Sequence, residues 1–354
     1  MSGAERFRGL PKVELHLHAA GSVRPATMRA FVAADGLSPA LADHYAPAAT
    51  GEGLPAYLAR FAAWDAAVNS PERLARVIAE LSADLRGDGV TYAEIRLRPP
   101  TEDDGLWHAM MEAAVQAARA APAPALDFIA VMLRGWSADR AEREARRAAA
   151  WAGQGVVALD VAGDEAIGGF ATLARAARLA RDAGLALATH AGESGGAAAV
   201  REALALLGPD RIAHGVGAAG DPTLVADLRD RGLHLEMAIR SNVQTAAVAD
   251  PSRHPFAALL RSGVSVGLNT DNRTISGTTL SEEYALAADA LGLSWAELAR
   301  ATTLAAQATF APAEARRVLV QRVQAGWASA EPRTSGGFSP SPLANPRADE
   351  GADH

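Results

Sequence analysis

Eight short apolar segments recur along the chain, and their alternation with helical segments is the feature that most limits how it can fold. Segments rich in Ala, Leu and Arg with helical periodicity separate most of them, for example GGFATLARAARLARDAG from Gly168. Alternating strands and helices, with nearly continuous apolar strands, indicate a parallel sheet that is covered on both faces. The apolar segments begin at Val13, Thr91, Leu126, Gly155, Leu185, Arg211, His234 and Ser265.

Eight such units favour an α/β fold closed into a (β/α)8 TIM barrel over an open doubly wound sheet. No GxGxxG motif of a nucleotide-binding sheet follows the first strand. The length of 354 residues suits a barrel of about 250 residues with additions. We therefore predict one barrel domain over residues 1–327. Residues 328–354 are rich in Pro, Ser, Gly and charge without an apolar period, and we predict a disordered tail there.

The interval between the first and second strands is too long for a minimal barrel unit. Roughly 70 residues separate the two strands, and three segments with helical periodicity begin at Pro25, Pro55 and Ser70. A minimal barrel unit has one helix between two strands, so two of these three predicted helices are additional. We expect this helical insertion, about residues 24–88, to lie over the carboxyl-terminal mouth of the barrel, where barrel enzymes keep their active sites.

Composition excludes several kinds of site and partner. The chain has no cysteine, so any metal ion is held by His, Asp or Glu. A net charge of −7 argues against a nucleic-acid partner. The start, MSGAERFRGLPK, lacks the apolar core of a signal peptide, and no run approaches the ~20 apolar residues of a membrane span. We expect a soluble cytoplasmic protein with a small-molecule substrate and no membrane partner; the oligomeric state stays open.

Polar residues suited to metal or proton chemistry end four of the eight predicted strands. His16 and His18 end the first strand, and His190 stands at the end of the fifth. His214 ends the sixth, and Asp271 follows the eighth. A single histidine at a strand end is more often structural, but in a barrel all these ends meet at one mouth. Imidazoles with one carboxylate are a suitable set for Zn²⁺, with a further position for water, whose pKa the metal lowers toward about 7.

The remaining histidines are assigned no catalytic part. His44, His108 and His354 lie in expected loops, helical segments or the tail. His234 begins the seventh strand, at the end of the barrel far from the mouth, and is interpreted as structural. His254, in SRHPF, is interpreted as part of a turn or a helix entry.

Six motifs, in order and spacing, resemble the adenosine deaminase family of metal-dependent hydrolases between about Leu10 and about Ala311. Each motif alone is weak evidence, whereas the six in sequence are highly specific. The resemblance implies a (β/α)8 barrel with one zinc ion and hydrolytic loss of ammonia from C6 of an adenine ring. The motifs are PKVELHLH, DVAGDE, THAGE, RIAHGVG, LNTDNR and GTTLSEEY.

The same resemblance assigns individual residues. Glu193, three residues after a ligand histidine, would donate a proton to purine N1 as water attacks C6. His214 would orient and deprotonate that water, with Asp271 assisting. Gly163 would approach purine N3 through its backbone, and His18 would also contact the substrate. The implied metal ligands are His16, His18, His190 and Asp271.

The chain departs from the family pattern at three places. Ala19 and Ala20 replace a Leu-Asp pair whose carboxylate holds the ribose 5′-hydroxyl. Asn272 replaces an Asp that faces purine N7, and its amide can still donate a hydrogen bond there. In the seventh strand the sequence AIRSN brings Arg240 near the expected mouth.

The leading hypothesis is a zinc aminohydrolase that acts on an adenine nucleoside. Because Ala20 neither repels nor crowds a 5′ substituent, the substrate is adenosine or a 5′-modified adenosine, with Arg240 available to an anionic group. An adenine deaminase or an AMP-type deaminase is the alternative. A catalytically inactive purine-binding relative is a third hypothesis, which the presence of Glu193, His214 and all four ligands disfavours.

Overall fold

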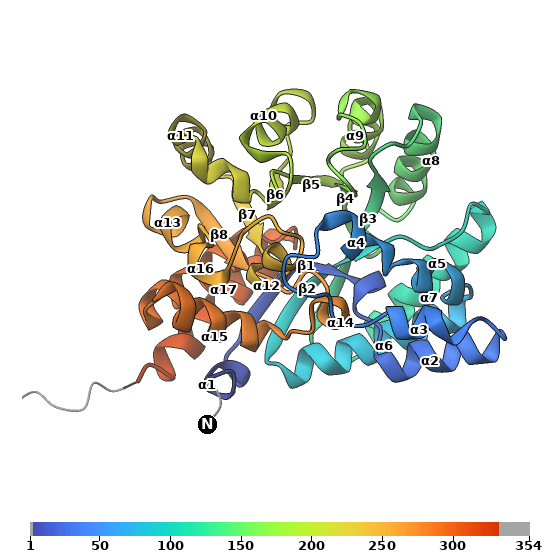
Figure 1. The fold of residues 1–354 in the computed structure, drawn as a ribbon, viewed down its shortest axis with the longest axis horizontal. Coiled ribbons are helices and arrows are strands. Elements are labelled where there is room, and N and C mark those ends of the chain that lie inside the picture. The colour runs from blue at the N-terminus through green and yellow to red at the C-terminus, as the bar shows by residue number, and fades with distance from the viewer. Residues whose placement is uncertain (1–2, 333–354) are drawn as a thin grey trace, which may run out of the picture.

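The computed structural model describes residues 3–332, and its centre is a single eight-stranded parallel sheet (Figure 1). Each strand pairs with its neighbours in the sequence, in the order β1 to β8. This is the predicted (β/α)8 barrel. The strands are β1 (Lys12–His18), β2 (Val90–Leu97), β3 (Ala125–Leu133), β4 (Val156–Ala162), β5 (Ala186–Ala191), β6 (Arg211–His214), β7 (His234–Met237) and β8 (Ser265–Leu268).

The barrel closes where β1 meets the residues that follow β8. The backbone N–H of Asp271 donates to the carbonyl of His16 at 2.9 Å, and the N–H of His18 donates to the carbonyl of Asp271 at 2.8 Å. The side-chain oxygen of Asn269 accepts from the N–H groups of Leu15 and His16 at 2.9 and 3.0 Å. A side chain thus takes the place of strand backbone at the seam, and no open sheet edge remains there.

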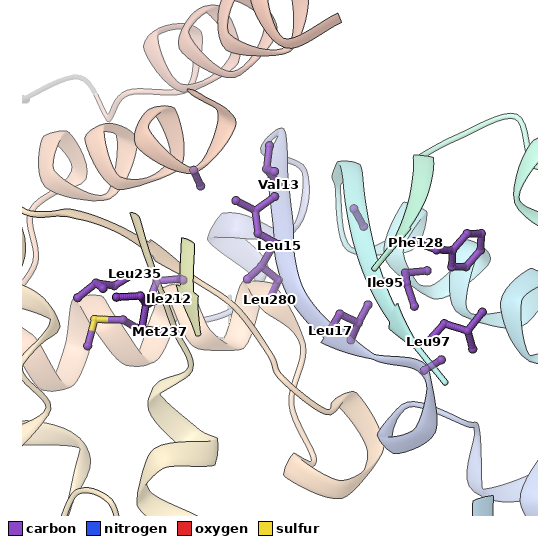
Figure 2. Close-up of a cluster of buried hydrophobic side chains, with 14 of the residues drawn as sticks. Val13, Leu15, Leu17, Ile95, Leu97, Phe128, Ile212, Leu235, Met237 and Leu280 are labelled. Carbon is purple, nitrogen blue, oxygen red and sulfur yellow. The ribbon is translucent and has the colours of Figure 1, made fainter. Parts of the chain in front are cut away.

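Strand β1 shows how the pattern of residues separates core from site. Val13, Leu15 and Leu17 are fully buried and project from one face of the strand into the apolar cluster drawn in Figure 2. Alternate residues of a strand point to opposite faces, so Glu14, His16 and His18 face the barrel interior. The apolar face packs on helices, and the polar face supplies chemistry.

A ring of helices surrounds the strands (Figure 1). Helix α6 (Pro71–Gly87) shows why they form: Ser70 caps it by accepting from the N–H of Arg73, Pro71 occupies its first turn, and Leu74, Ile78 and Leu81 bury one face. The helices after β2 to β7 are α7 (Asp104–Ala120), α8 (Ala138–Ala149), α9 (Ala174–Asp182), α10 (Gly196–Leu206), α11 (Pro222–Arg231), α12 (Ile239–Gln244) and α13 (Phe256–Arg261). After β8 come α14 (Arg273–Ser276), α15 (Leu280–Leu291), α16 (Trp295–Gln307) and α17 (Ala313–Ser329). Helix α1 (Glu5–Arg8) precedes β1, and short 3-10 turns cover Ala19–Gly21, Ala171–Leu173, Val216–Gly220 and Pro251–Arg253.

The insertion after β1 holds five helices where the sequence predicted three. They are α2 (Pro25–Ala34), α3 (Pro39–His44), α4 (Leu54–Ala59), α5 (Ala62–Ala67) and α6 (Pro71–Gly87). The predicted segment from Pro55 divides because the N–H groups of Arg60 and Phe61 bond three residues back, to Tyr57 and Leu58, and so tighten the chain there. Helix α3 was not expected; Pro39 occupies its first turn.

The last helix, α17, packs against the segment that precedes β1. Trp327 is buried, and its indole N–H donates to the carbonyl of Pro11 at 3.1 Å. Ala328 and Ser329, which were expected to begin the tail, are the last residues of α17. The rest of the predicted tail from residue 333 lies outside the described residues. Within residues 3–332, no helix combines the length and the apolar character that a membrane span needs.

Candidate active site

A cavity of about 260 Å³ opens at the carboxyl ends of the strands. Its floor carries the polar residues predicted from the strand ends, and its outer wall includes apolar residues of α4 and α5, such as Leu54 and Trp64. Two helices of the insertion therefore contribute to the wall of the cavity. The predicted residues that line the cavity are His18, Ala20, Gly163, His190, Glu193, His214, Asp271 and Asn272.

Four donor atoms lie close together at the floor of the cavity. His18 Nε2 lies 3.2 Å from His16 Nε2 and 3.3 Å from His190 Nε2. Asp271 Oδ1 lies 3.2 Å from His16 Nε2 and 3.4 Å from His18 Nε2. Ligand bonds of about 2.0–2.1 Å in a tetrahedral zinc site place neighbouring donors roughly 3.3 Å apart. The spacing and the N/O donor set therefore fit a divalent ion such as Zn²⁺.

Buried charges behind the floor hold two of these imidazoles. His190 Nδ1 lies 2.9 Å from Asp160 Oδ2, and His16 Nδ1 lies 3.5 Å from Glu236 Oε2. The guanidinium of Arg96 donates to both carboxylates, at 2.8 Å to Asp160 and 2.5 Å to Glu236. A carboxylate on Nδ1 leaves Nε2 free to bind a metal ion. None of these three residues was given a role from the sequence, although Asp160 lies in the motif DVAGDE; their signal was charge inside otherwise apolar strands.

Glu193 lies beside the metal quartet with its carboxyl group almost fully buried. Oε1 accepts a hydrogen bond from Thr245 Oγ1 at 2.8 Å, and Oε2 lies 3.6 Å from His214 Nε2. Burial, with the nearby Asp271 carboxylate, raises the pKa of Glu193 to about 8. The carboxyl group is therefore largely protonated at neutral pH, the state that a proton donor requires.

A chain of hydrogen bonds sets the proton position on His214. The backbone N–H of Phe256 donates to His254 Nδ1 at 3.2 Å, so in neutral His254 the proton is on Nε2, which donates to Asn242 Oδ1 at 3.1 Å. Asn242 Nδ2 then donates to His214 Nδ1 at 3.0 Å. The proton of neutral His214 is thereby placed on Nε2, the atom that faces Glu193. This differs from the expectation that His214 deprotonates water, and it gives His254 a role that the sequence did not indicate.

Three cavity residues have backbone in the left-handed region. His214 and Asp271 have φ of 62° and 60°, which non-glycine residues adopt rarely and mostly at functional sites. Ser241 Oγ donates to Asp271 Oδ2 at 2.6 Å and so fixes that carboxylate. Gly163 has φ of 100°, a conformation strained for any side chain.

Two of the departures from the family pattern, Ala20 and Asn272, line the cavity. Asn272 Nδ2 donates to the hydroxyl of Tyr57 at 2.9 Å. Its Oδ1 packs so tightly on Gly21 that a Cβ there would lie only 1.8 Å away, which explains the glycine. Ala20 lines the cavity and brings no polar side chain; its carbonyl accepts from the hydroxyl of Tyr45 at 2.7 Å.

Arg240 does not line this cavity, contrary to the expectation that it contacts substrate. It is the second residue of α12, and its side chain turns outward toward Glu282 and Asp289 in a separate surface pocket. Its Nε lies 4.0 Å from Glu283 Oε1. The next two residues of α12, Ser241 and Asn242, turn inward instead. The arginine that reaches the mouth is Arg98, which the sequence analysis missed.

The other histidines lie apart from the cavity. His44 ends α3, and His108 in α7 accepts from the indole N–H of Trp151 at 3.0 Å. His234 is buried at the start of β7, with Nδ1 2.8 Å from Ser265 Oγ. His354 lies outside the described residues.

Comparison with known proteins identifies the fold and the family. The family model described as adenosine deaminase matches residues 11–326. An adenosine deaminase of Mycobacterium sp. (strain JLS) is 33% identical over 347 residues, covering 90% of this chain and 95% of that protein. The zinc-bound structure of an amidohydrolase from Burkholderia ambifaria aligns with a TM-score of 0.85 and 24% identity, covering 93% and 94% of the two chains. An adenine deaminase from Arthrobacter aurescens aligns with a TM-score of 0.81 and 23% identity, covering 90% and 99%.

Match and coverage extend over nearly the whole barrel, including every strand that carries a candidate ligand. The enzyme class follows from the family: a metal-dependent aminohydrolase that cleaves a C–N bond of a cyclic amidine. The chain belongs to the adenosine deaminase family.

Proposed function

We propose that this protein removes the 6-amino group of an adenine nucleoside by hydrolysis and gives the 6-oxo product and ammonia. The observation that carries the proposal is a buried carboxyl group, Glu193, held by Thr245 beside three imidazoles and a carboxylate whose donor atoms are suited to a divalent ion. His16, His18, His190 and Asp271 would hold that ion, most simply Zn²⁺. A bound divalent ion lowers the pKa of water and so supplies a nucleophile near neutral pH.

The residues around the cavity carry out the proton transfers and position the purine ring. Glu193 donates its proton to ring N1, which draws electrons from C6 as water adds there. His214 holds the attacking water through its Nε2–H, and the Asp271 carboxylate accepts the water's proton. The C6–N bond then breaks, ammonia leaves with that proton, and the remaining hydroxyl proton returns to Glu193 as the 6-oxo group forms. Gly163 and Asn272 flank the ring on opposite sides, near N3 and N7.

The sugar side of the substrate follows from Ala20. Without a carboxylate at this position the space near the ribose 5′ carbon is open, so we propose that adenosine and adenosines with an uncharged 5′ substituent are accepted. An anionic substituent was expected to pair with Arg240. Because Arg240 lies outside the cavity, the support for an AMP-type substrate is lost.

The test compares kcat/KM of the zinc-loaded protein for adenosine, 5′-deoxy- and 5′-thioadenosines, AMP and adenine. We expect a nucleoside to exceed both AMP and adenine by more than tenfold. Adenine as the best substrate would make the protein an adenine deaminase. Adenosine exceeding every 5′-modified nucleoside by more than tenfold would contradict the argument from Ala20. A metal-loaded protein inert toward all five would be a purine-binding relative without activity.

A further inference from the structure

The mouth of the cavity is apolar except at one ion pair. Leu58 and Phe61 form part of its outer wall, and Val131 and Leu133 of β3 form part of its inner wall. Between the two walls, Asp65 of α5 pairs with Arg98, the residue next but one after Arg96. The Arg98 side chain is 22% exposed and that of Asp65 is 51% exposed, so both reach solvent at the opening.

These two residues are the charged lining groups that the chemistry on the floor does not use. The other charged or titratable lining groups are the candidate metal ligands, Glu193 and His214, Arg96, which Asp160 and Glu236 hold, and Tyr57, whose hydroxyl bonds to Asn272 and Ser276. Arg98 Nη2 donates to Asp65 Oδ1. Within residues 3–332, Asp65 Oδ2 and the Nε and Nη1 of Arg98 make no hydrogen bond. The pair therefore presents an acceptor and several donors to whatever enters.

The order of the strands indicates which part of a ligand meets the pair. This step rests on the proposed function, in which Glu193, after β5, binds ring N1. In a purine, N9 lies across the ring from N1. In a closed eight-stranded barrel, the strand across from β5 is β1. The N9 substituent is thus directed toward the ends of β1 and β2, where Ala20 and Arg98 line the cavity.

We propose that Asp65 and Arg98 together bind two hydroxyl groups of an uncharged sugar on N9. One hydroxyl donates to Asp65 Oδ2, because a carboxylate only accepts, and a second accepts from Arg98, because a guanidinium only donates. An anionic substituent is disfavoured because it would have to displace Asp65 from Arg98 and then lie against a carboxylate. The insertion thereby supplies the sugar contact that the side chain of Ala20 does not.

The test measures how each variant changes the preference for nucleoside over free base. In Asp65→Ala and Arg98→Gln, we expect the ratio of kcat/KM for adenosine to kcat/KM for adenine to fall about tenfold or more, since a hydrogen bond to a charged group is lost. The matched control is Asp84→Ala, which breaks an ion pair between Asp84 of α6 and Arg24, again within the insertion but outside the cavity. The control should keep the wild-type ratio.

Product binding gives a second readout that does not need turnover. Tryptophan fluorescence, reported by Trp64 in the cavity wall, follows the binding of inosine and hypoxanthine to the metal-loaded protein and its variants. Weaker binding of inosine alone in both variants supports the pair even if no 6-aminopurine is deaminated, an outcome that would contradict only the proposed function. Unchanged ratios in folded variants, or a wild-type protein that prefers AMP to adenosine, would overturn the inference.

Discussion

Glu193 and Asp271 are two nearly buried carboxyl groups in one cavity, and their surroundings drive their pKa values apart. Burial raises the pKa of Glu193 to about 8. Burial also disfavours the charged form of Asp271, but the hydrogen bond and charge of His16 and the charge of His18 outweigh it and lower its pKa well below the usual range. Two such carboxyl groups can serve as acid and base in one reaction.

Replacing Glu193 tests the acid. Glu193→Gln keeps the size and the contact with Thr245 but has no proton of suitable acidity to give to N1. We expect kcat to fall about 10²- to 10⁴-fold, with one metal ion per chain still present by elemental analysis. Activity within tenfold of wild type would remove Glu193 from the mechanism.

The pH dependence follows from the same residue. The protonated form of Glu193 is the active one, so kcat/KM is maintained below its pKa and lost as the pH rises through it. A bound cation stabilises the carboxylate and lowers this pKa further, so we expect the alkaline midpoint at or below about pH 8. A profile that stays flat to pH 10 would contradict the assignment.

The residues behind the ligands give a prediction about affinity. In Asp160→Asn the carboxylate that faces His190 Nδ1 is lost, and we expect zinc to bind about 10- to 100-fold more weakly in a metal-buffered titration. Asp127→Asn is the control: Asp127 accepts from the hydroxyl of Tyr92, near the start of β3 and away from the ligand quartet, and its loss should leave zinc affinity unchanged. Equal affinities in the two variants would show that Asp160 does not support the ligand.

At the scale of the element, the strands and their ends were predictable because the information is local. In a segment such as VELHLH every second residue is apolar, which predicts a strand, and the polar residues between them are the ones that face the barrel interior. The division between α4 and α5 was not predictable, because both halves have helical periodicity. The two helices are separated only by two backbone hydrogen bonds that span three residues instead of four. Arg240 was misplaced for a similar reason: sequence AIRSN does not show that a helix begins at Ile239 and turns this one side chain outward.

Contacts between elements were also beyond the sequence. The backbone N–H of Phe256 and the side chains of His254 and Asn242 fix the proton on His214, and no sequence motif indicates these contacts. The ion pair between Asp65 and Arg98 joins the insertion to the end of β2, and no sequence pattern predicts this contact either. The family motifs nevertheless located the floor of the cavity, because each lies at the end of a strand.

The loop after β4 offers a prediction that separates strain from function. Gly163→Ala places a side chain at φ of 100°, and Gly184→Ala places one at φ of 85° in open space away from the cavity. We expect each to lower the free energy of unfolding by about 1–3 kcal/mol, measured by denaturant titration. Only Gly163→Ala should also lower kcat/KM. Equal loss of activity in both variants would show that strain alone matters at Gly163.

At the scale of the whole molecule, metal and fold stabilise each other. His18 Nε2 lies 3.2–3.4 Å from donor atoms of His16, His190 and Asp271, which come from β1, β5 and the segment after β8, so an ion bound there would join these three parts of the barrel. A metal ion that binds only the folded state raises its stability by mass action. We expect chelation to lower Tm by several degrees and added Zn²⁺ to restore it. The same Tm with and without chelator would argue against a metal at this site.

The seam between β1 and the residues after β8 has a consequence for how the protein is made. His16 and Asn269, which meet at the seam, stand 253 positions apart in the sequence. On a ribosome the first two histidines emerge long before Asp271 exists, and they cannot form the site until translation has passed the eighth strand. A nascent chain is therefore unable to assemble the metal centre until nearly the whole barrel has been synthesised. A metal ion could then bind at this site only after the barrel has been synthesised and has closed.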